Sequence, residues 1–375
     1  MPDIVVRPAR LADGRELIYF DDEGSTLPAE RAEDRRPGEQ RPPTATMRQD
    51  LLTGDWVSIA SARQNRAFLP PAEADPLAPQ TASNPSEVPS EYDVVVFENR
   101  SPSFGPALAD HADAAPEGLA DLALPGVGRT RTSVGRCEVV CFDPRTEGSF
   151  ADLWPNRVRT VVEAWAQRTA ALSALPGVQQ VFPFENRGEA IGVTLHHPHG
   201  QIYAYPYVTP RTSRLLEQID RYDGDLFADL LAFEQAGERV VLATRHFTAF
   251  VPFAARWPVE LHLLPNRHVP DLAALTDEER DELAEVALRL VRAVDALYDD
   301  PTPYIAAWHQ APVHSHRDSV RLNWQITSPR RGPDRLKYLA GSEAAMGAWI
   351  GDLVPEQTAE RLRTALAKAD AERPL

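Results

Sequence analysis

Runs of valine and aromatic residues bounded by Pro, Asn or Gly recur along the chain, and such runs predict short β-strands. In the first half of the chain these runs are 55–60, 92–99, 137–142, 178–186 and 201–208. Between the third and fourth runs, the apolar residues of 153–175 recur at helical spacing. That spacing predicts an amphipathic helix.

The second half repeats this arrangement. Its predicted strands are 239–252, 260–265, 304–312 and 320–327. A long helix is predicted over 275–299, because Thr276 is a suitable N-cap and acidic residues fill the first turn. A last helix is predicted from about 355 to 371. Since each half carries strands, one long helix and more strands, we expect an internal duplication in an α+β fold of mainly antiparallel strands with helices packed on one side.

Three stretches lack either periodicity. Clustered Arg, Glu and Pro residues in 31–46 indicate an extended, poorly packed arm over 1–46. The Pro- and Ala-rich stretches 70–90 and 105–127 are predicted to be irregular. We therefore divide the chain into an N-terminal arm at 1–46, an N-terminal half at 47–210 and a C-terminal half at 211–375.

Charge and composition restrict the class of protein. Of 375 residues, 43% are hydrophobic and 25% are charged, which is ordinary for a globular protein. The net charge of -16 argues against nucleic acid as a partner, while a few local cations could still hold a small phosphorylated ligand. There is no apolar run long enough for a membrane span and no signal-peptide pattern at the N-terminus.

The chain has two cysteines, Cys137 and Cys141, which lie four residues apart on one predicted strand. Their Cα atoms would be about 13 Å apart, too far for a disulfide. We expect buried, reduced thiols and a cytoplasmic protein.

The sequence His197-Pro198-His199-Gly200-Gln201 stands directly before a predicted strand. The proline favours an extended residue before it, and the glycine permits the close approach of another backbone or a ligand. A neutral imidazole can attack phosphorus without a separate base, and the nucleotidyl-imidazole that results can pass its group to a second acceptor. The amide of Gln201 can donate to a phosphoryl oxygen.

This motif resembles the active-site motif of galactose-1-phosphate uridylyltransferases, a branch of the histidine-triad superfamily. Five blocks in the family's order extend the resemblance over about residues 47–370; they are 53–66, 92–104, 184–201, 257–269 and 336–350. The resemblance implies a duplicated histidine-triad-like fold. It also implies ping-pong transfer of UMP from UDP-glucose to galactose 1-phosphate, through a uridylyl-histidine, to give UDP-galactose and glucose 1-phosphate.

The resemblance assigns roles residue by residue. His199 matches the family nucleophile, the carbonyl of His197 would orient its ring, and Gln201 would bind the transferred phosphoryl group. The remaining matches are Arg63 and Arg66 at the phosphates, Asn99 and Asn186 at uridine and phosphate, and Lys337, Tyr338 and Glu343 at the hexose and its phosphate. In the family the last block reaches the neighbouring subunit, which implies a homodimer with sites at the subunit interface.

Several of these residues also have plain structural interpretations. The two arginines could be surface charges, the two asparagines could form turns at strand ends, and Lys337 and Glu343 could form a structural ion pair. Ser342 and Trp349 stand where the family has sugar contacts, so the hexose preference stays open.

The chain departs from the family at its metal sites. Many members bind structural zinc through a Cys-x-x-Cys pair together with the residue matched by His197. The aligned segment here is 75–79, and both thiols are missing. Because a tetrahedral zinc site needs its four ligands, we predict no zinc and no other cofactor. His309 matches one ligand of a second metal site found in some relatives, but Thr327 and Pro329 replace others. His314 and His316 could hold a metal with His309, but as loop histidines they are expected to be solvated.

Two other functions are compatible with parts of the sequence. Another histidine-triad nucleotidyltransferase, phosphorylase or hydrolase could use the same histidine. Hydrolytic branches commonly carry a third histidine where Gln201 stands, and the Lys337–Glu343 block favours a sugar-phosphate acceptor, of which an unusual hexose 1-phosphate remains one. A non-catalytic nucleotide-sugar binder would not need the intact His199.

Overall fold

The computed structural model describes residues 3–38, 41, 44–61, 68–105, 122–123 and 128–375. Its main sheet has eleven strands, all antiparallel to their neighbours, in the order β1-β2-β5-β8-β10-β9-β14-β15-β13-β12-β11. Their bounds are β1 Val5–Arg10, β2 Glu16–Asp21, β5 Val94–Glu98, β8 Arg136–Cys141, β9 Gln180–Arg187, β10 His199–Tyr205, β11 Val240–Ala243, β12 Phe247–Phe250, β13 Val259–Pro265, β14 Tyr304–His309 and β15 Asn323–Ser328. The predicted α+β class with a mainly antiparallel sheet is confirmed.

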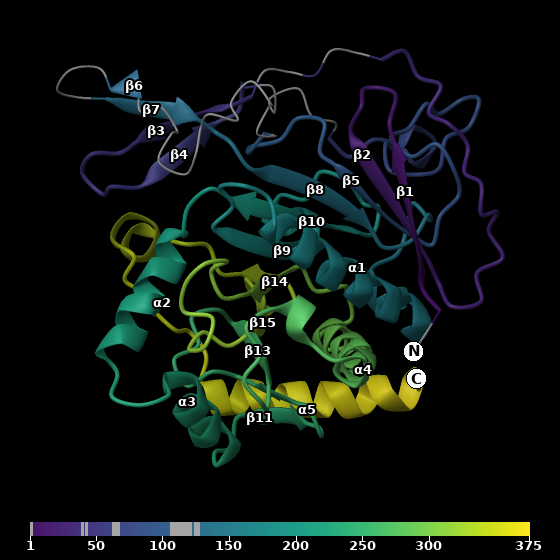
Figure 1. Ribbon diagram of the computed structural model, residues 1–375. Helices are drawn as coiled ribbons and strands as arrows, with labels where there is room; N and C mark the ends of the chain where they lie inside the picture. The colour runs from purple at the N-terminus through teal and green to yellow at the C-terminus, as the bar shows by residue number, and fades with distance from the viewer. Residues whose placement is uncertain (1–2, 39–40, 42–43, 62–67, 106–121, 124–127) are drawn as a thin grey trace.

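Three long helices cover one face of this sheet (Figure 1). They are α1 Pro155–Ser173, α4 Asp277–Asp295 and α5 Pro355–Glu372, as the apolar periodicity predicts. Thr276 caps α4 as expected, in a reciprocal capping box with Glu279. Among the described residues, no helix is both long and apolar enough to cross a membrane.

The internal duplication predicted from the sequence is visible in the strand order. In the first half, α1 lies between β8 and β9 in the chain; in the second half, α4 lies between β13 and β14. The sheet then reads β5-β8-β10-β9 up to its centre and β14-β15-β13-β12 beyond it, which is the same order reversed. Strands β9 and β14 pair at the centre and join the two halves into one sheet.

Opposite faces of the sheet have separate cores. On the helix side, Phe142, Phe150 and Trp165 pack together with Trp308 and Trp324. On the other side, a smaller cluster joins alternate residues of β2, β5 and β8 to the loop 75–92; it contains Leu17, Tyr19, Leu77, Tyr92, Val95, Phe97 and Cys141. This second cluster holds the loop 75–92, whose residues Asp75 and Tyr92 contact His197.

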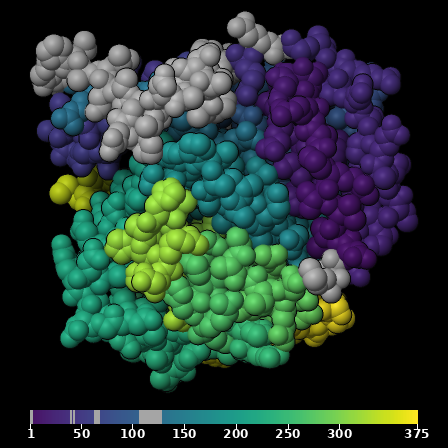
Figure 2. Space-filling model, viewed as in Figure 1, coloured from purple at the N-terminus to yellow at the C-terminus, as the bar shows by residue number. Residues whose placement is uncertain are grey.

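Three expectations need correction. Strands β1 and β2 extend the main sheet and β2 is buried, so this part of the expected loose arm is packed (Figure 2). The single strand expected over 239–252 is a hairpin, because the chain turns between Ala243 and Phe247. Two helices were not predicted: α2 Pro210–Arg221 and α3 Leu226–Gln235.

The remaining elements are small. Strands β3 Thr46–Gln49, β4 Trp56–Ile59, β6 Leu122–Ala123 and β7 Arg129–Thr132 form a separate four-stranded sheet, and β16 Arg330–Gly332 pairs with β17 Arg335–Leu336. Short 3-10 turns occur at Ala72–Ala74, Phe150–Asp152, Glu189–Ile191 and Leu272–Ala274, and a π-helical turn occurs at Gly341–Ala345. The irregular character predicted for 70–90 is confirmed.

Candidate active site

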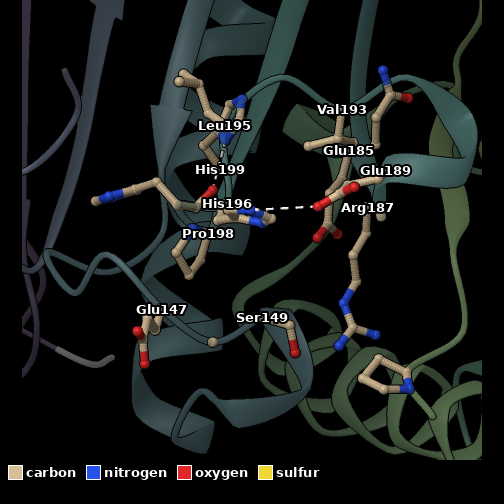
Figure 3. A pocket seen from close by; sticks show the side chains of 15 residues that line it. Glu147, Ser149, Glu185, Arg187, Glu189, Val193, Leu195, His196, Pro198 and His199 are labelled. Atoms are coloured by element: carbon tan, nitrogen blue, oxygen red, sulfur yellow. Dashed lines mark hydrogen bonds and ion pairs between the residues drawn. The ribbon is translucent and has the colours of Figure 1, made fainter. Parts of the chain in front are cut away.

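A cavity of about 460 Å³ lies where β10 begins and β9 ends (Figure 3). Its lining comes from 147–149 before α1, from 185–189 at the end of β9, from 193 and 195–199 leading into β10, and from Pro301 before β14. Three residues of the predicted motif, His197, Pro198 and His199, line it, and so does the preceding His196. The first three residues of the sequence motif therefore stand at a cavity.

Backbone contacts on both sides fix the position of His199. The amide of Phe142 donates to the Pro198 carbonyl at 3.0 Å, and His199 then begins β10 opposite Cys141. A Cβ atom on Gly200 would lie 2.8 Å from Phe142 Cζ and 2.9 Å from the Phe184 carbonyl oxygen. Only glycine fits there, because the neighbouring strand approaches so closely.

The ring of His199 is held in one orientation by the backbone. Its Nδ1 lies 2.7 Å from the His197 carbonyl oxygen. A carbonyl can only accept, so Nδ1 carries the proton and Nε2 keeps its lone pair. Burial lowers the pKa of His199 to about 4. The imidazole is therefore neutral near pH 7, and its lone pair is available for attack on phosphorus.

Two amide side chains share the face of the sheet that carries His199. Gln201 follows His199 by two positions and pairs with Phe184, and Asn186 is two positions beyond Phe184 on β9. Because alternate residues of a strand point to the same side, the side chains of His199, Gln201 and Asn186 lie on one face. Within the part of the chain that the structure describes, neither amide has a hydrogen-bond partner. Both can therefore donate to a ligand.

His197 is buried, and both of its ring nitrogens have partners. Nδ1 lies 2.6 Å from Asp75 Oδ2, and Nε2 lies 2.9 Å from the hydroxyl of Tyr92. Sequence reasoning considered Asp75 only as a position where a thiol is missing, and did not identify Tyr92. The available signal was Asp75 itself, because an acid that replaces a metal-binding cysteine can instead accept a hydrogen bond from the histidine.

A second buried acid lies in the cavity wall. Glu185 accepts a hydrogen bond from the Tyr304 hydroxyl at 3.0 Å, and burial raises its pKa to about 8. The carboxyl group is therefore mostly neutral at pH 7 and places little negative charge beside an anionic ligand. Arg187, two residues further on, forms an ion pair with Asp295. Neither Glu185 nor Arg187 was predicted as a site residue, although an acidic residue at a buried position of a strand is unusual.

The structure does not bring every predicted residue to this cavity. Asn99 lies in a turn: its side-chain Oδ1 accepts from Ser101 N at 2.9 Å, and its backbone N–H donates to the Cys137 carbonyl. Cys137 pairs with Tyr203, four residues beyond His199, so Asn99 lies about 13 Å farther along the strands. Arg63 and Arg66 fall outside the described residues.

The predicted hexose block lies beside the cavity in this chain, not in it. Lys337 Nζ contacts Glu343 Oε1 at 3.2 Å and donates to the carbonyls of Arg256 and Ile350, so all three of its protons have acceptors. Tyr338 is 77% exposed. Lys337 and Tyr338 line a smaller cavity of about 160 Å³ together with Ala190 and Ile191, which follow directly in the chain on the 185–189 segment of the first cavity.

Comparison with known proteins covers nearly the whole chain. The family described as galactose-1-phosphate uridyl transferase matches with its N-terminal domain at residues 40–209 and with its C-terminal domain at 211–373. A galactose-1-phosphate uridylyltransferase of Streptomyces lividans is 44% identical over 94% of this chain and 96% of its own length. The Thermotoga maritima protein of the same name is 34% identical over 84% and 97%.

A solved structure named uridylyltransferase superposes with a TM-score of 0.74 at 28% identity, covering 86% of this chain and 99% of its own. Together, the cavity with its neutral histidine, the two family matches and these relatives lead to one conclusion: the chain belongs to the galactose-1-phosphate uridylyltransferase family and is a transferase.

Proposed function

We propose that this protein transfers UMP from UDP-glucose to galactose 1-phosphate by way of His199. In the first step Nε2 attacks the α-phosphorus, a P–N bond forms, and the bridging P–O bond breaks to release glucose 1-phosphate. In the second step a phosphate oxygen of galactose 1-phosphate attacks the same phosphorus, the P–N bond breaks, and UDP-galactose leaves while His199 returns to its neutral form. The observation that carries the proposal is the neutral His199 ring, whose Nδ1 proton is held by the His197 carbonyl.

The substrates are proposed from the relatives and from the chemistry of the site. The similar proteins are named for galactose 1-phosphate and for uridylyl transfer. The leaving groups are sugar phosphates, stable anions that need little protonation, so the site needs hydrogen-bond donors for the transferring phosphoryl group more than it needs a strong acid. Gln201 and Asn186 supply amide donors beside His199, and Arg63 and Arg66 are kept as phosphate contacts in the proposal.

We further propose a homodimer in which Lys337, Tyr338 and Glu343 serve the partner's hexose site. In support, the segment around them exposes large apolar side chains that a partner would cover: Tyr338 at 77%, Met346 at 81% and Ile350 at 57%. Light scattering on the purified protein tests the dimer. We also propose a cytoplasmic location, which the two buried thiols, Cys137 and Cys141, support.

Incubation with UDP-glucose alone tests the reaction. Intact-mass analysis should detect one UMP adduct together with free glucose 1-phosphate, and galactose 1-phosphate should then remove the adduct and release UDP-galactose. Parallel incubations with inorganic phosphate or buffer alone separate a transferase from a phosphorylase or hydrolase. If folded protein gives no adduct with UDP-glucose, the proposed donor or the covalent route is wrong.

A further inference from the structure

The ring of His197 is held from both sides inside the protein. Its side chain has no exposed surface, and its two nitrogens lie 2.6 Å from Asp75 Oδ2 and 2.9 Å from Tyr92 Oη. The Tyr92 hydroxyl also reaches the carbonyl oxygens of Leu77 at 2.9 Å and of Asp143 at 3.2 Å. The backbone of the same histidine provides the carbonyl that holds His199 Nδ1. One buried residue therefore links the nucleophile to two distant side chains.

These residues do not fit the structural zinc that the family resemblance implies. Two ligands of one tetrahedral zinc ion lie about 3.3 Å apart, because each bond is about 2.0–2.1 Å long. The 2.6 Å between His197 Nδ1 and Asp75 Oδ2 is shorter and is the length of a direct charge-assisted hydrogen bond. Among the described residues, no group of three His, Cys, Asp or Glu side chains could hold a metal ion.

The loop that carries Asp75 is itself anchored. Asp75 Oδ1 accepts from the amide of Leu77 at 2.9 Å, and Asn84 donates to the Asp75 carbonyl at 2.8 Å. The backbone N–H of Glu87 donates to the Pro76 carbonyl, and the side chains of Leu77 and Tyr92 are buried in the smaller core cluster. The carboxylate of Asp75 is therefore presented by a rigid loop, as a group that positions another group must be.

We propose that Asp75 and Tyr92 are positioning residues for the nucleophile, which fix the His197 ring by hydrogen bonds where relatives use a metal. Their clamp, together with Pro198, sets the direction of the His197 carbonyl. That carbonyl fixes both the rotation of the His199 ring and the nitrogen that keeps the proton. The role in catalysis rests on the proposed UMP transfer; the clamp itself does not.

The Asp75→Asn variant distinguishes the contact with His197 from the contact that holds the loop. Aspartate offers two acceptor oxygens, one for Leu77 N and one for His197 Nδ1, whereas asparagine has only one. Asp75→Asn can keep the local turn with Leu77 and present its NH₂ group to the imidazole, which misdirects the ring. Tyr92→Phe removes the other contact. Asn84→Ala is the matched control, because it loosens the same loop without touching the imidazole.

The experiment measures single-turnover formation of the UMP adduct from UDP-glucose for these variants. Asp75→Asn and Tyr92→Phe should slow the step by about 10- to 100-fold, as small misplacements of reacting groups do, with the KM for UDP-glucose changed by less than about twofold. Asn84→Ala should react at the wild-type rate. Wild-type protein should contain no stoichiometric zinc and should keep its activity after treatment with a chelator.

Proton NMR provides a readout that does not depend on transfer. The Nδ1–H of His197, bonded to a carboxylate, should give a downfield resonance that is present in wild type and Asn84→Ala and absent in Asp75→Asn. An adduct rate in Asp75→Asn equal to wild type, an equal loss in Asn84→Ala, or tightly bound zinc needed for activity would each overturn the proposal. If wild-type protein forms no adduct, the proposed function fails, and the resonance and metal content still decide whether the clamp exists.

Discussion

Replacing Glu185 by Gln should change how stability depends on pH. The carboxyl group is 5% exposed, and burial is the main cause that raises its pKa from 4.5 to about 8. The Tyr304 hydroxyl donates to it, and a glutamine oxygen can accept the same bond. The substitution therefore keeps shape and hydrogen bonding while removing a group that must lose its proton as pH rises.

The size and sign follow from the two pKa values. In the unfolded chain the carboxyl ionises near pH 4.5, but in the folded protein it holds its proton until about pH 8. Its contribution to stability is therefore fully present below pH 4.5 and is lost as pH rises through 8. At about 1.4 kcal/mol per pKa unit, wild type should lose about 3.5 kcal/mol relative to Glu185→Gln between pH 5 and pH 8.

Urea unfolding of both proteins at pH 5, 6, 7 and 8 measures this difference. Every other titrating group is common to the two chains, so its effect cancels in the difference of unfolding free energies. The gap should grow in favour of Glu185→Gln as pH increases, with unchanged m-values. A gap that stays constant within about 0.5 kcal/mol would refute the reasoning, because the acid would then ionise alike in both states.

Three further predictions concern the nucleophile. His199→Asn should abolish UMP transfer and formation of the UMP adduct, while calorimetry should still detect binding of UDP-glucose. Wild type should take up one UMP per chain. A UMP adduct on the variant would point to another nucleophile. Gln201→Ala should slow adduct formation by about 10² if its amide stabilises the transferring group, and an unchanged rate would remove that role. Because the pKa of His199 is lowered to about 4 by burial, the adduct rate should stay nearly flat from pH 8 to about pH 5. An inflection near pH 6.5 would show an ordinary histidine.

The parts of the fold that depend on local periodicity could be predicted from the sequence. The Thr276 capping box and the apolar spacing of the long helices are signals read within a few residues. The hairpin between β11 and β12 was missed because its turn, 244–246, contains no Gly, Pro or Asn. Strand β1 was missed because the arm was assigned over 1–46 from the composition of 31–46. Its Pro8 is tolerated because β1 is an edge strand.

The site divides in the same way. The motif around His199 predicts its chemistry because imidazole, glycine and amide act at fixed short spacing. The partners of His197 could not be predicted from short spacing, because Asp75 and Tyr92 lie 122 and 105 residues away in sequence. Glu185 becomes neutral only because the folded sheet excludes water from it.

The two halves of the fold differ at the position of the proposed nucleophile, as the corresponding strands β10 and β15 show. Asn323 is the first residue of β15, as His199 is the first of β10, and Gln325 follows it as Gln201 follows His199. Between them, Trp324 replaces Gly200 and stacks on Trp308 with ring centroids 5.4 Å apart. An amide has no basic nitrogen to attack phosphorus, whereas the imidazole of His199 does. The second half therefore keeps the strand order but has an amide where the first half has the proposed nucleophile. A nucleophile at His199 would give the expected stoichiometry of one UMP per chain.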